Sequence, residues 1–225
     1  MGPSLAAGGR LYLTTVDGKV LCLGGEGTQL PEAPITQLAP LDISVKPLPP
    51  LPKPKTGPSA KGDFAKVIRA DVTQCKLGYH LRADGKKTGL ALKKLPKPLK
   101  GNVTLKARLK STPSEPLRNG FLVFGHAPEE AGLVKCGLRF LMGKAVIVEG
   151  AISSGKVADK ALYLDLAKTY ELDVTVDLAS GQVTMKTNGA TLTAKLDHPP
   201  ASISYVGYET LNAATDFSPI QVSGK

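Results

Sequence analysis

The sequence predicts an all-β protein whose larger part folds as an antiparallel sandwich or barrel. From residue 63 onward, short runs of alternating apolar and polar residues recur at intervals of about 8–12 residues, which is typical of strands in such folds. Turn residues such as Asn188-Gly189 separate these runs. Hydrophobic residues make up 42% of the 225 residues, which is enough for a packed core. The segment ADKALYLDLAKT is the only helix candidate.

The first element expected along the chain is a β-hairpin at residues 9–23. Apolar or β-branched residues stand on both sides of Asp17-Gly18 in GRLYLTTVDGKVLCL. Asp and Gly suit a two-residue turn that needs positive φ at both positions. A single hairpin is only marginally stable in water, so we expect its apolar side chains to need a packing partner.

A proline-rich linker is expected next. Residues 24–62 contain nine of the 18 prolines, and proline lacks the amide donor that a helix or a central strand requires. The run PPLPKPK favours an extended polyproline II spacer, with a ligand for an SH3-like partner as the alternative. We therefore expect a hairpin part at 1–30, a linker at 31–62 and a sandwich domain at 63–225.

The sandwich domain is expected to consist of short strands with one buried face. In TYELDVTVDL, apolar residues alternate with Glu171, Asp173, Thr175 and Asp177. The run VTLKARLKS repeats the pattern and turns its basic residues outward. Strands are expected near 67–74, 77–82, 88–93, 102–110, 119–125, 134–141, 144–149, 161–165, 170–178, 181–187, 190–196, 203–209 and 215–223.

The net charge of +10 is unevenly distributed. Residues 66–110 contain 13 Lys and Arg against two Asp, a surplus of +11, whereas residues 111–225 carry a net charge of −2. This asymmetry indicates an anionic partner such as an acidic polysaccharide, a nucleic acid or a membrane surface. The alternative is that the lysines only solvate exposed strands and block edge pairing. Because basic and aromatic residues are not interleaved, we expect no nucleic-acid binding.

The cysteines and histidines suggest no metal site. Cys22, Cys75 and Cys136 are odd in number and lack CxxC spacing, so free thiols are expected, with a Cys75–Cys136 disulfide as the alternative. His80, His126 and His198 share no ligand spacing. The run from Gly150 to Lys156 resembles a phosphate-binding loop, but Val157 replaces the required Ser or Thr, so we expect a plain loop.

The N-terminal run GGRLYLTTVDGKVLCLGG resembles a repeat of the quinoprotein-like (PQQ-like) β-propeller family. Blades of that family contain a strand of the LYLTT type, a DG turn and a strand of the VLCL type. The resemblance covers about 18 residues, whereas a blade has four strands and a propeller several blades. It implies that this part belongs with an upstream propeller region.

Residues 63–225 resemble the concanavalin A-like (laminin-G/glucanase-type) jelly-roll superfamily. The resemblance rests on NGFLVFG, the hairpin KCGLRFLMGKAVIVEG, the run TYELDVTVDLASGQVTMKTNGATLTAKL and the closing strand ATDFSPIQVSGK. It implies a jelly-roll sandwich, a fold that carries lectins, glycan hydrolases, adhesion modules and spacers. Calcium sites are frequent in that superfamily, and Asp216 or Asp165 could contribute to one. The sequence has no Asp/Asn-rich loop, so we expect no cofactor.

Glu171 and Asp173 are the candidate catalytic residues that the resemblance implies. Laminarinase-type hydrolases of this fold carry acids at E-x-D-x-E or E-x-D-x-x-E on one strand. Here Thr175 and Val176 stand where the third acid is needed. A retaining glycosidase places its two carboxyl groups about 5–5.5 Å apart. The alternative is an acidic row that pairs across the sheet with Lys106, Arg108 or Arg139.

A binding surface for a polymer is the other candidate site. Lys106, Arg108 and Lys110 form an outward row in which next-but-one residues rise about 6.6 Å along the strand. Arg139 and one tyrosine complete the candidate set. Tyr205 and Tyr208 are three residues apart and alternate between faces unless Gly207 forms a bulge, so only one faces a ligand. We chose Tyr208.

These observations favour a non-catalytic accessory or binding module for a carbohydrate or another extracellular polymer, acidic or neutral. A glycan-acting hydrolase of the same superfamily and a purely structural module of a surface protein are the alternatives. The resemblance implies an extracytoplasmic or cell-surface location, although residues 1–13 show no signal peptide. No apolar run approaches the length of a membrane span.

Overall fold

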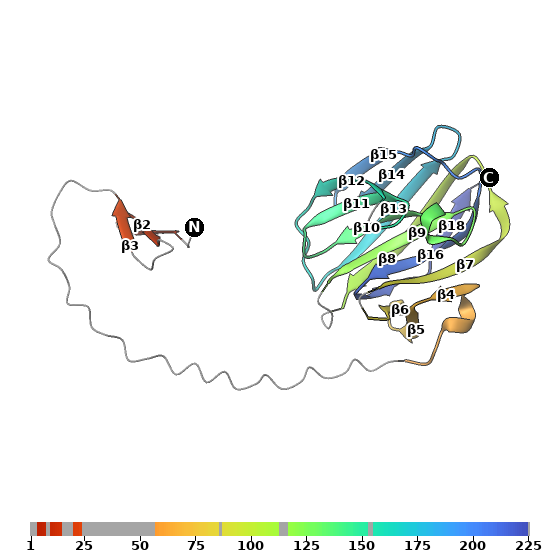
Figure 1. Ribbon diagram of the computed structural model, residues 1–225, viewed down its shortest axis with the longest axis horizontal. Helices are drawn as coiled ribbons and strands as arrows, with labels where there is room; N and C mark the ends of the chain where they lie inside the picture. The colour runs from red at the N-terminus through yellow and green to blue at the C-terminus, as the bar shows by residue number, and fades with distance from the viewer. Residues whose placement is uncertain are drawn as a thin grey trace. The chain divides into compact units, whose positions relative to one another are not determined.

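The computed structural model divides the chain into two units, Met1–Pro49 and Pro50–Lys225. It describes residues 57–224 apart from 86, 113–116 and 153–154, and it also describes the backbone of strands within 4–7, 10–14 and 20–23. The predicted turn at Asp17-Gly18 and most of the predicted linker lie outside the described residues. Each unit is a β structure of its own (Figure 1).

The first unit contains a three-stranded antiparallel sheet. Its strands are β1 (Ser4–Ala7), β2 (Arg10–Thr14) and β3 (Val20–Leu23), in the order β1-β2-β3. In the β2–β3 pair, Leu11 lies opposite Leu23 and Thr14 opposite Val20, so the predicted antiparallel pairing is confirmed. The sequence did not predict β1, which is short and rich in alanine.

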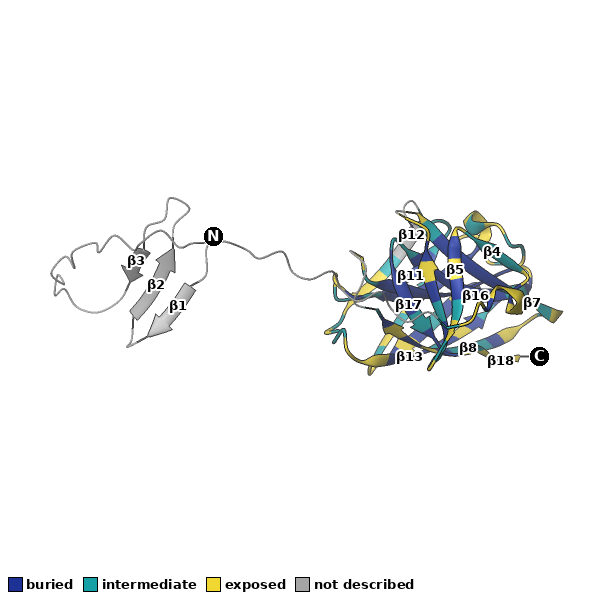
Figure 2. Cartoon of the chain, turned by 90° about the horizontal axis from the view of Figure 1, so that it is seen from below, coloured by how far each residue is buried: buried dark blue, intermediate teal, exposed yellow. Residues whose placement is uncertain are grey.

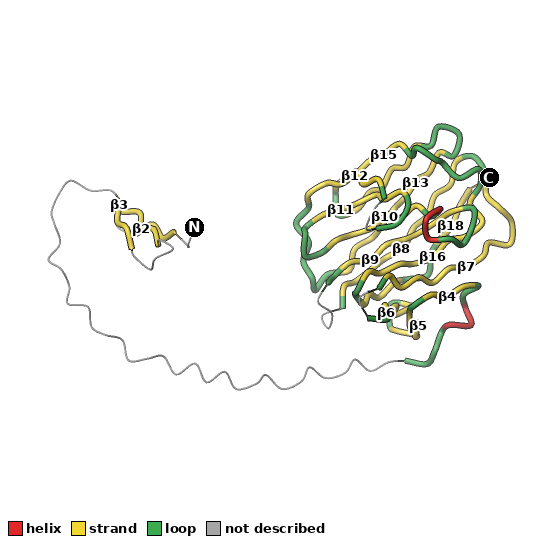
Figure 3. Tube along the Cα trace, viewed as in Figure 1, coloured by secondary structure: helices red, strands yellow, loops and turns green. Residues whose placement is uncertain are grey.

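The second unit is a sandwich of two antiparallel sheets (Figures 1 and 3). One sheet has the order β12-β11-β10-β9-β16-β7-β4, and the other has the order β15-β14-β13-β8-β17-β6-β5, with β18 also paired to β8. The predicted jelly-roll sandwich is confirmed. The strands are β4 (Lys66–Ile68), β5 (Ala70–Cys75), β6 (Gly78–Ala83), β7 (Thr88–Leu99), β8 (Asn102–Ser111), β9 (Asn119–Gly125), β10 (Val134–Arg139), β11 (Lys144–Glu149), β12 (Lys156–Ala161), β13 (Thr169–Asp177), β14 (Gln182–Thr187), β15 (Ala190–Lys195), β16 (Ile203–Leu211), β17 (Ala214–Phe217) and β18 (Gln221–Gly224).

Three predicted segments differ from the structure. The expected strand 67–74 divides at Arg69, which has a φ of 48°, so that β4 and β5 join different sheets. The expected strand 215–223 is interrupted between β17 and β18, where Pro219 has no amide to donate. The helix candidate and the expected strand 161–165 are both wrong, because β12 covers Lys156–Ala161 and pairs with β11. The described residues contain two single 3₁₀ turns, Lys61–Asp63 and Glu130–Gly132 (Figure 3).

The central core lies between the two sheets. Strands β8 and β13 alternate between buried and more exposed residues, as predicted, and this alternation is visible in Figure 2. Their buried side chains pack with rings from the opposite sheet and from β17, including Phe124, Tyr208 and Phe217. The rings of Tyr208 and Phe217 are stacked with their centroids 4.6 Å apart. Burial of this apolar surface is the main force that holds the sheets together.

A second apolar cluster covers the other face of the seven-stranded sheet. It contains Leu90 and Leu92 from β7, Phe121 and Val123 from β9, and two residues of β11. Leu133 and Ile152, from the loops before β10 and after β11, close over it. Every residue of β9 is therefore buried, which is unusual for an antiparallel strand. We call this set the outer apolar cluster.

Candidate functional site

The predicted basic row lies on the outward face of the eight-stranded sheet. Lys106, Arg108 and Lys110 alternate along β8 with the buried residues Ala107 and Leu109. Arg108 and Lys110 are exposed, and the Lys106 side chain is 44% exposed. The three cations therefore share one solvent-facing strip.

An acidic row on β13 lies beside the basic row. Glu171 is directly opposite Arg108, and Asp173 is directly opposite Lys106. The Lys106 ammonium lies 2.7 Å from the Asp173 carboxylate. The hydrogen bond and the charge of Asp173 raise the pKa of Lys106. The positive charge of the strip is thus partly compensated, as the alternative of cross-strand pairs predicted for Lys106.

Two shallow hollows flank Glu171 on this face. One, of about 240 Å³, is lined by Lys106, Arg108, Glu171, Ser218, Pro219 and Gln221. The other, of about 330 Å³, is lined by Glu171, Asp173, Lys186, Asn188 and Thr191 together with neighbouring residues. Both hollows present charged and amide groups on either side of one carboxylate. We call this surface of β8, β13 and β14 the polar face.

The other two candidate ligand residues lie elsewhere. Tyr208 is only 1% exposed, and its hydroxyl donates a hydrogen bond to the carbonyl of Ser218. Burial raises the pKa of this hydroxyl. Tyr205 packs against the outer apolar cluster, so the two tyrosines lie on opposite faces of the sheet as expected. Tyr208, however, is the one that points into the central core. Arg139 lies on β10 in the other sheet and donates a hydrogen bond to the carbonyl of Ile152.

A group of three titratable residues lies on the neighbouring strands β5, β6 and β17. His80 Nδ1 lies 2.7 Å from Asp216 Oδ1, and Asp216 also interacts with the Cys75 thiol. A nucleophilic cysteine needs the imidazole as its direct partner and a lowered pKa. Here the carboxylate lies between the two, and burial together with Asp216 raises the pKa of Cys75. This arrangement does not activate the thiol.

The structure also places the residues that were considered for a disulfide and for a calcium site. Cys75 and Cys136 are both free thiols. Asp216 faces His80, and Asp165 accepts a hydrogen bond from the amide of Ala167. Among the described residues, no group of three or more His, Cys, Asp and Glu side chains could hold a metal ion.

Sequence reasoning missed a third hollow, on the outward face of the seven-stranded sheet. It has a volume of about 320 Å³ and is lined mostly by apolar residues together with Arg118 and Arg139. The available signal was Leu141-Met142 in the turn between β10 and β11, where large apolar side chains are out of place.

Comparisons with known proteins support the fold. No protein-family model matches the chain, and no curated protein matches its sequence. The carbohydrate-binding module CBM66 from Bacillus subtilis is 11% identical with a TM-score of 0.60, over 71% of this chain and 94% of that module. A sialidase is also 11% identical, with a TM-score of 0.53, over 70% of this chain and 16% of the sialidase. At this identity the likeness shows the fold alone, a jelly-roll β-sandwich.

A separate finding concerns membranes. Within the described part of the chain, no helix has the length and apolar character needed to cross a bilayer.

Proposed function

We propose that the sandwich domain is a non-catalytic carbohydrate-binding module that acts through its polar face. The observation that carries the proposal is the pair of hollows on either side of Glu171, lined by outward Lys, Arg, Asn and Gln side chains. Sugars present many hydroxyl groups, and such side chains can donate to and accept from them. The similar fold of CBM66, a module named for carbohydrate binding, supports the proposal.

The proposed ligand is a polysaccharide that carries acidic groups. Arg108 and Lys110 stand exposed on one strand, where their spacing can follow anionic groups along a polymer. Arg108 also lines a hollow, and its guanidinium can bind a carboxylate through two hydrogen bonds. Because the strip is open to solvent, salt should screen this attraction, with a Debye length of about 8 Å at physiological ionic strength.

Binding to polygalacturonate tests this proposal. We expect weak binding that falls at high salt and falls by about tenfold in the double variant Lys106→Glu with Arg108→Glu. The matched control is Lys94→Glu with Lys97→Glu, which makes the same charge change at exposed positions of β7 in the other sheet. If the affinity for polygalacturonate changes neither with salt nor in the first double variant, the polar face does not bind the polymer.

A glycan-acting hydrolase is the second candidate, because Glu171 and Asp173 line the same hollow. The sequence provides Thr175 where the related hydrolases carry a third acid, which favours the binding module. Release of reducing sugar that is abolished by Glu171→Gln would reverse the preference.

The proposal extends to the rest of the chain. The three antiparallel strands described in the N-terminal unit are similar to part of a four-stranded propeller blade, and with the sequence resemblance they support an upstream propeller region as its partner. With a linker at 31–62, the sandwich domain would be an accessory module of a larger extracytoplasmic or cell-surface protein.

A further inference from the structure

The hollow on the seven-stranded sheet is lined by most of the large hydrophobic side chains that are exposed in the described part of the chain. Among the described residues, the exposed large hydrophobics are Leu117, Leu141, Met142 and Tyr163, with exposures of 41%, 57%, 60% and 87%. The first three line this one hollow. Exposed apolar side chains gathered around a hollow mark an interaction site, because a ligand would remove them from water.

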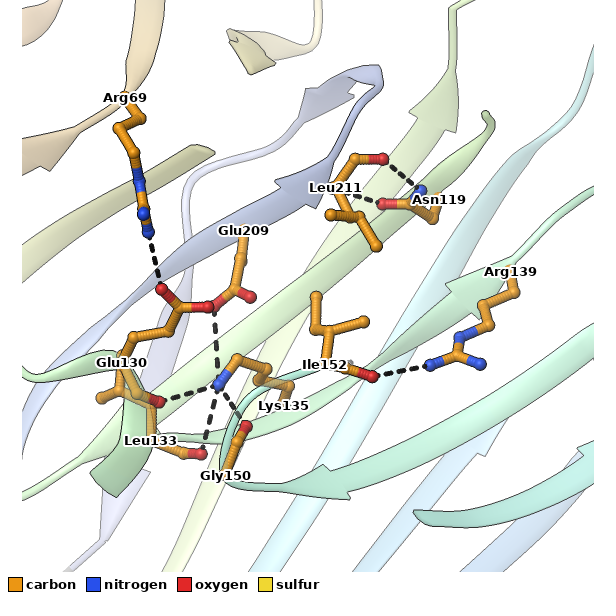
Figure 4. Close-up of polar contacts among 10 residues, drawn as sticks. All are labelled: Arg69, Asn119, Glu130, Leu133, Lys135, Arg139, Gly150, Ile152, Glu209 and Leu211. Carbon is orange, nitrogen blue, oxygen red and sulfur yellow. Dashed lines mark hydrogen bonds and ion pairs between the residues drawn. The ribbon is translucent and has the colours of Figure 1, made fainter. Parts of the chain in front are cut away.

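The floor and one wall of the hollow are held by hydrogen bonds. The Asn119 side chain accepts from the Leu211 amide and donates to the Leu211 carbonyl, at 2.8 Å in both cases. Arg139 Nη2 donates to the Ile152 carbonyl at 3.3 Å, and Lys135 donates to the Gly150 carbonyl, so two side chains of β10 hold the loop after β11 (Figure 4). Binding therefore needs little reorganisation of these walls.

The charge at the hollow has one sign. Among the described residues that line it, the charged ones are Arg118 and Arg139, and none of the described lining residues is acidic. Apolar residues supply the remainder of the lining, apart from Asn119. A guanidinium beside an apolar surface suits a carboxylate attached to a hydrocarbon chain, because it can bind both carboxylate oxygens.

We propose that this hollow binds a small amphipathic carboxylate, with its hydrocarbon chain against Leu117, Leu141 and Met142 and its carboxylate at Arg118 and Arg139. A volume of about 320 Å³ lies at the lower end of the range for small-molecule sites, about 300–1,000 Å³, which suits one medium-length acyl chain. The unbranched side chain of Met142 can adapt to such a chain. This site is separate from the polar face and does not depend on the proposed function.

Methionine methyl NMR with decanoate tests the proposal on the full chain. Met142 lines the hollow, whereas Met185 is fully buried in the central core and serves as an internal control for the fold. We expect a saturable shift of the Met142 methyl signal and an unchanged Met185 signal. Decanol should bind at least about fivefold more weakly than decanoate, because it lacks the charge.

Variants separate the charge from the packing. Arg118→Gln and Arg139→Gln should each weaken decanoate binding by about fivefold to tenfold while the Met185 signal stays in place. Arg139→Lys keeps the charge and should lose less than Arg139→Gln. The matched control is Arg108→Gln on the polar face, which should leave decanoate binding unchanged.

Three results would overturn the proposal. They are the absence of saturation by decanoate below its micelle-forming concentration, equal binding of decanol and decanoate, and loss of binding in Arg108→Gln. Loss of polygalacturonate binding in the polar-face variants with decanoate binding intact would support both sites as independent.

Discussion

At the scale of single residues, the most unusual feature is the buried pair of Lys135 and Glu209. Both side chains are fully buried, and Lys135 Nζ lies 3.7 Å from Glu209 Oε2 (Figure 4). Lys135 donates to the carbonyls of Glu130 and Gly150, whereas neither Glu209 oxygen has a hydrogen-bond partner among the described residues. Burial raises the pKa of Glu209 to about 8 and lowers the pKa of Lys135. This direction predicts that Glu209 holds its proton to a higher pH than a free glutamate does.

This protonation predicts a pH dependence of stability. Because the pKa of Glu209 rises from 4.5 to about 8 on folding, the native state binds the extra proton between these values. The free energy of unfolding should therefore fall as the pH rises through this window. Glu209→Gln removes this dependence, so between about pH 5 and about pH 8 the variant should lose less stability than the native chain, by more than about 1 kcal/mol.

Urea unfolding at both pH values, followed by circular dichroism, measures the effect. Glu129→Gln is the control, because Glu129 is exposed and directly precedes Glu130, whose carbonyl Lys135 binds. Parallel pH profiles for the native chain and Glu209→Gln would mean that Glu209 is already ionised at pH 5.

At the scale of elements, the sequence predicted strands well where one face meets the core and the other meets water. The alternation along β8 and β13 correctly predicted which residues point outward. The strand β9 could not be assigned a face in this way, because loops from distant parts of the sequence cover its second side. The sequence also could not predict that the chain passes from one sheet to the other at Arg69, because β4 and β5 together have the apolar pattern of one longer strand.

Glycine in β10 allows close packing in this doubly covered sheet. A Cβ on Gly137 would collide with the carbonyl oxygen of Gly120 and lie 2.8 Å from Cδ1 of Phe121. We expect Gly137→Ala to lower the free energy of unfolding by about 1–3 kcal/mol, because a neighbouring strand must shift. Urea denaturation measures this loss. Gly62→Ala, where a Cβ meets nothing within 4 Å, should change stability little, and an equal loss in both variants would refute the packing argument.

At the scale of the whole molecule, the two candidate sites differ in how far sequence could find them. The basic row needs only the alternation of one strand, so Lys106, Arg108 and Lys110 were predictable. A pairing of this row with acids was expected only as an alternative, and the particular partner of Lys106 could not be predicted, because its pairing with Asp173 depends on the register between β8 and β13. The apolar hollow combines residues from four separate segments, which only the folded chain brings together. Tyr208 shows the limit of alternation, which separates two faces but does not say which one is buried.

The last prediction concerns where the sandwich domain begins. The carbonyl of Pro58 accepts from the Gln74 amide, and the Ala60 amide donates to the Val72 carbonyl, so the chain already pairs with β5 before residue 63. Lys61 forms an ion pair with Asp71 at 2.9 Å. Lys46 and Lys53 each precede a proline, which blocks trypsin, whereas Lys55 precedes Thr56. If the proline-rich linker ends before these contacts, limited trypsin digestion should cut first after Lys55 and leave a stable fragment that begins at Thr56. Mass spectrometry of the fragments identifies the cut, and early cleavage after Lys61 or within residues 100–220 would contradict this boundary.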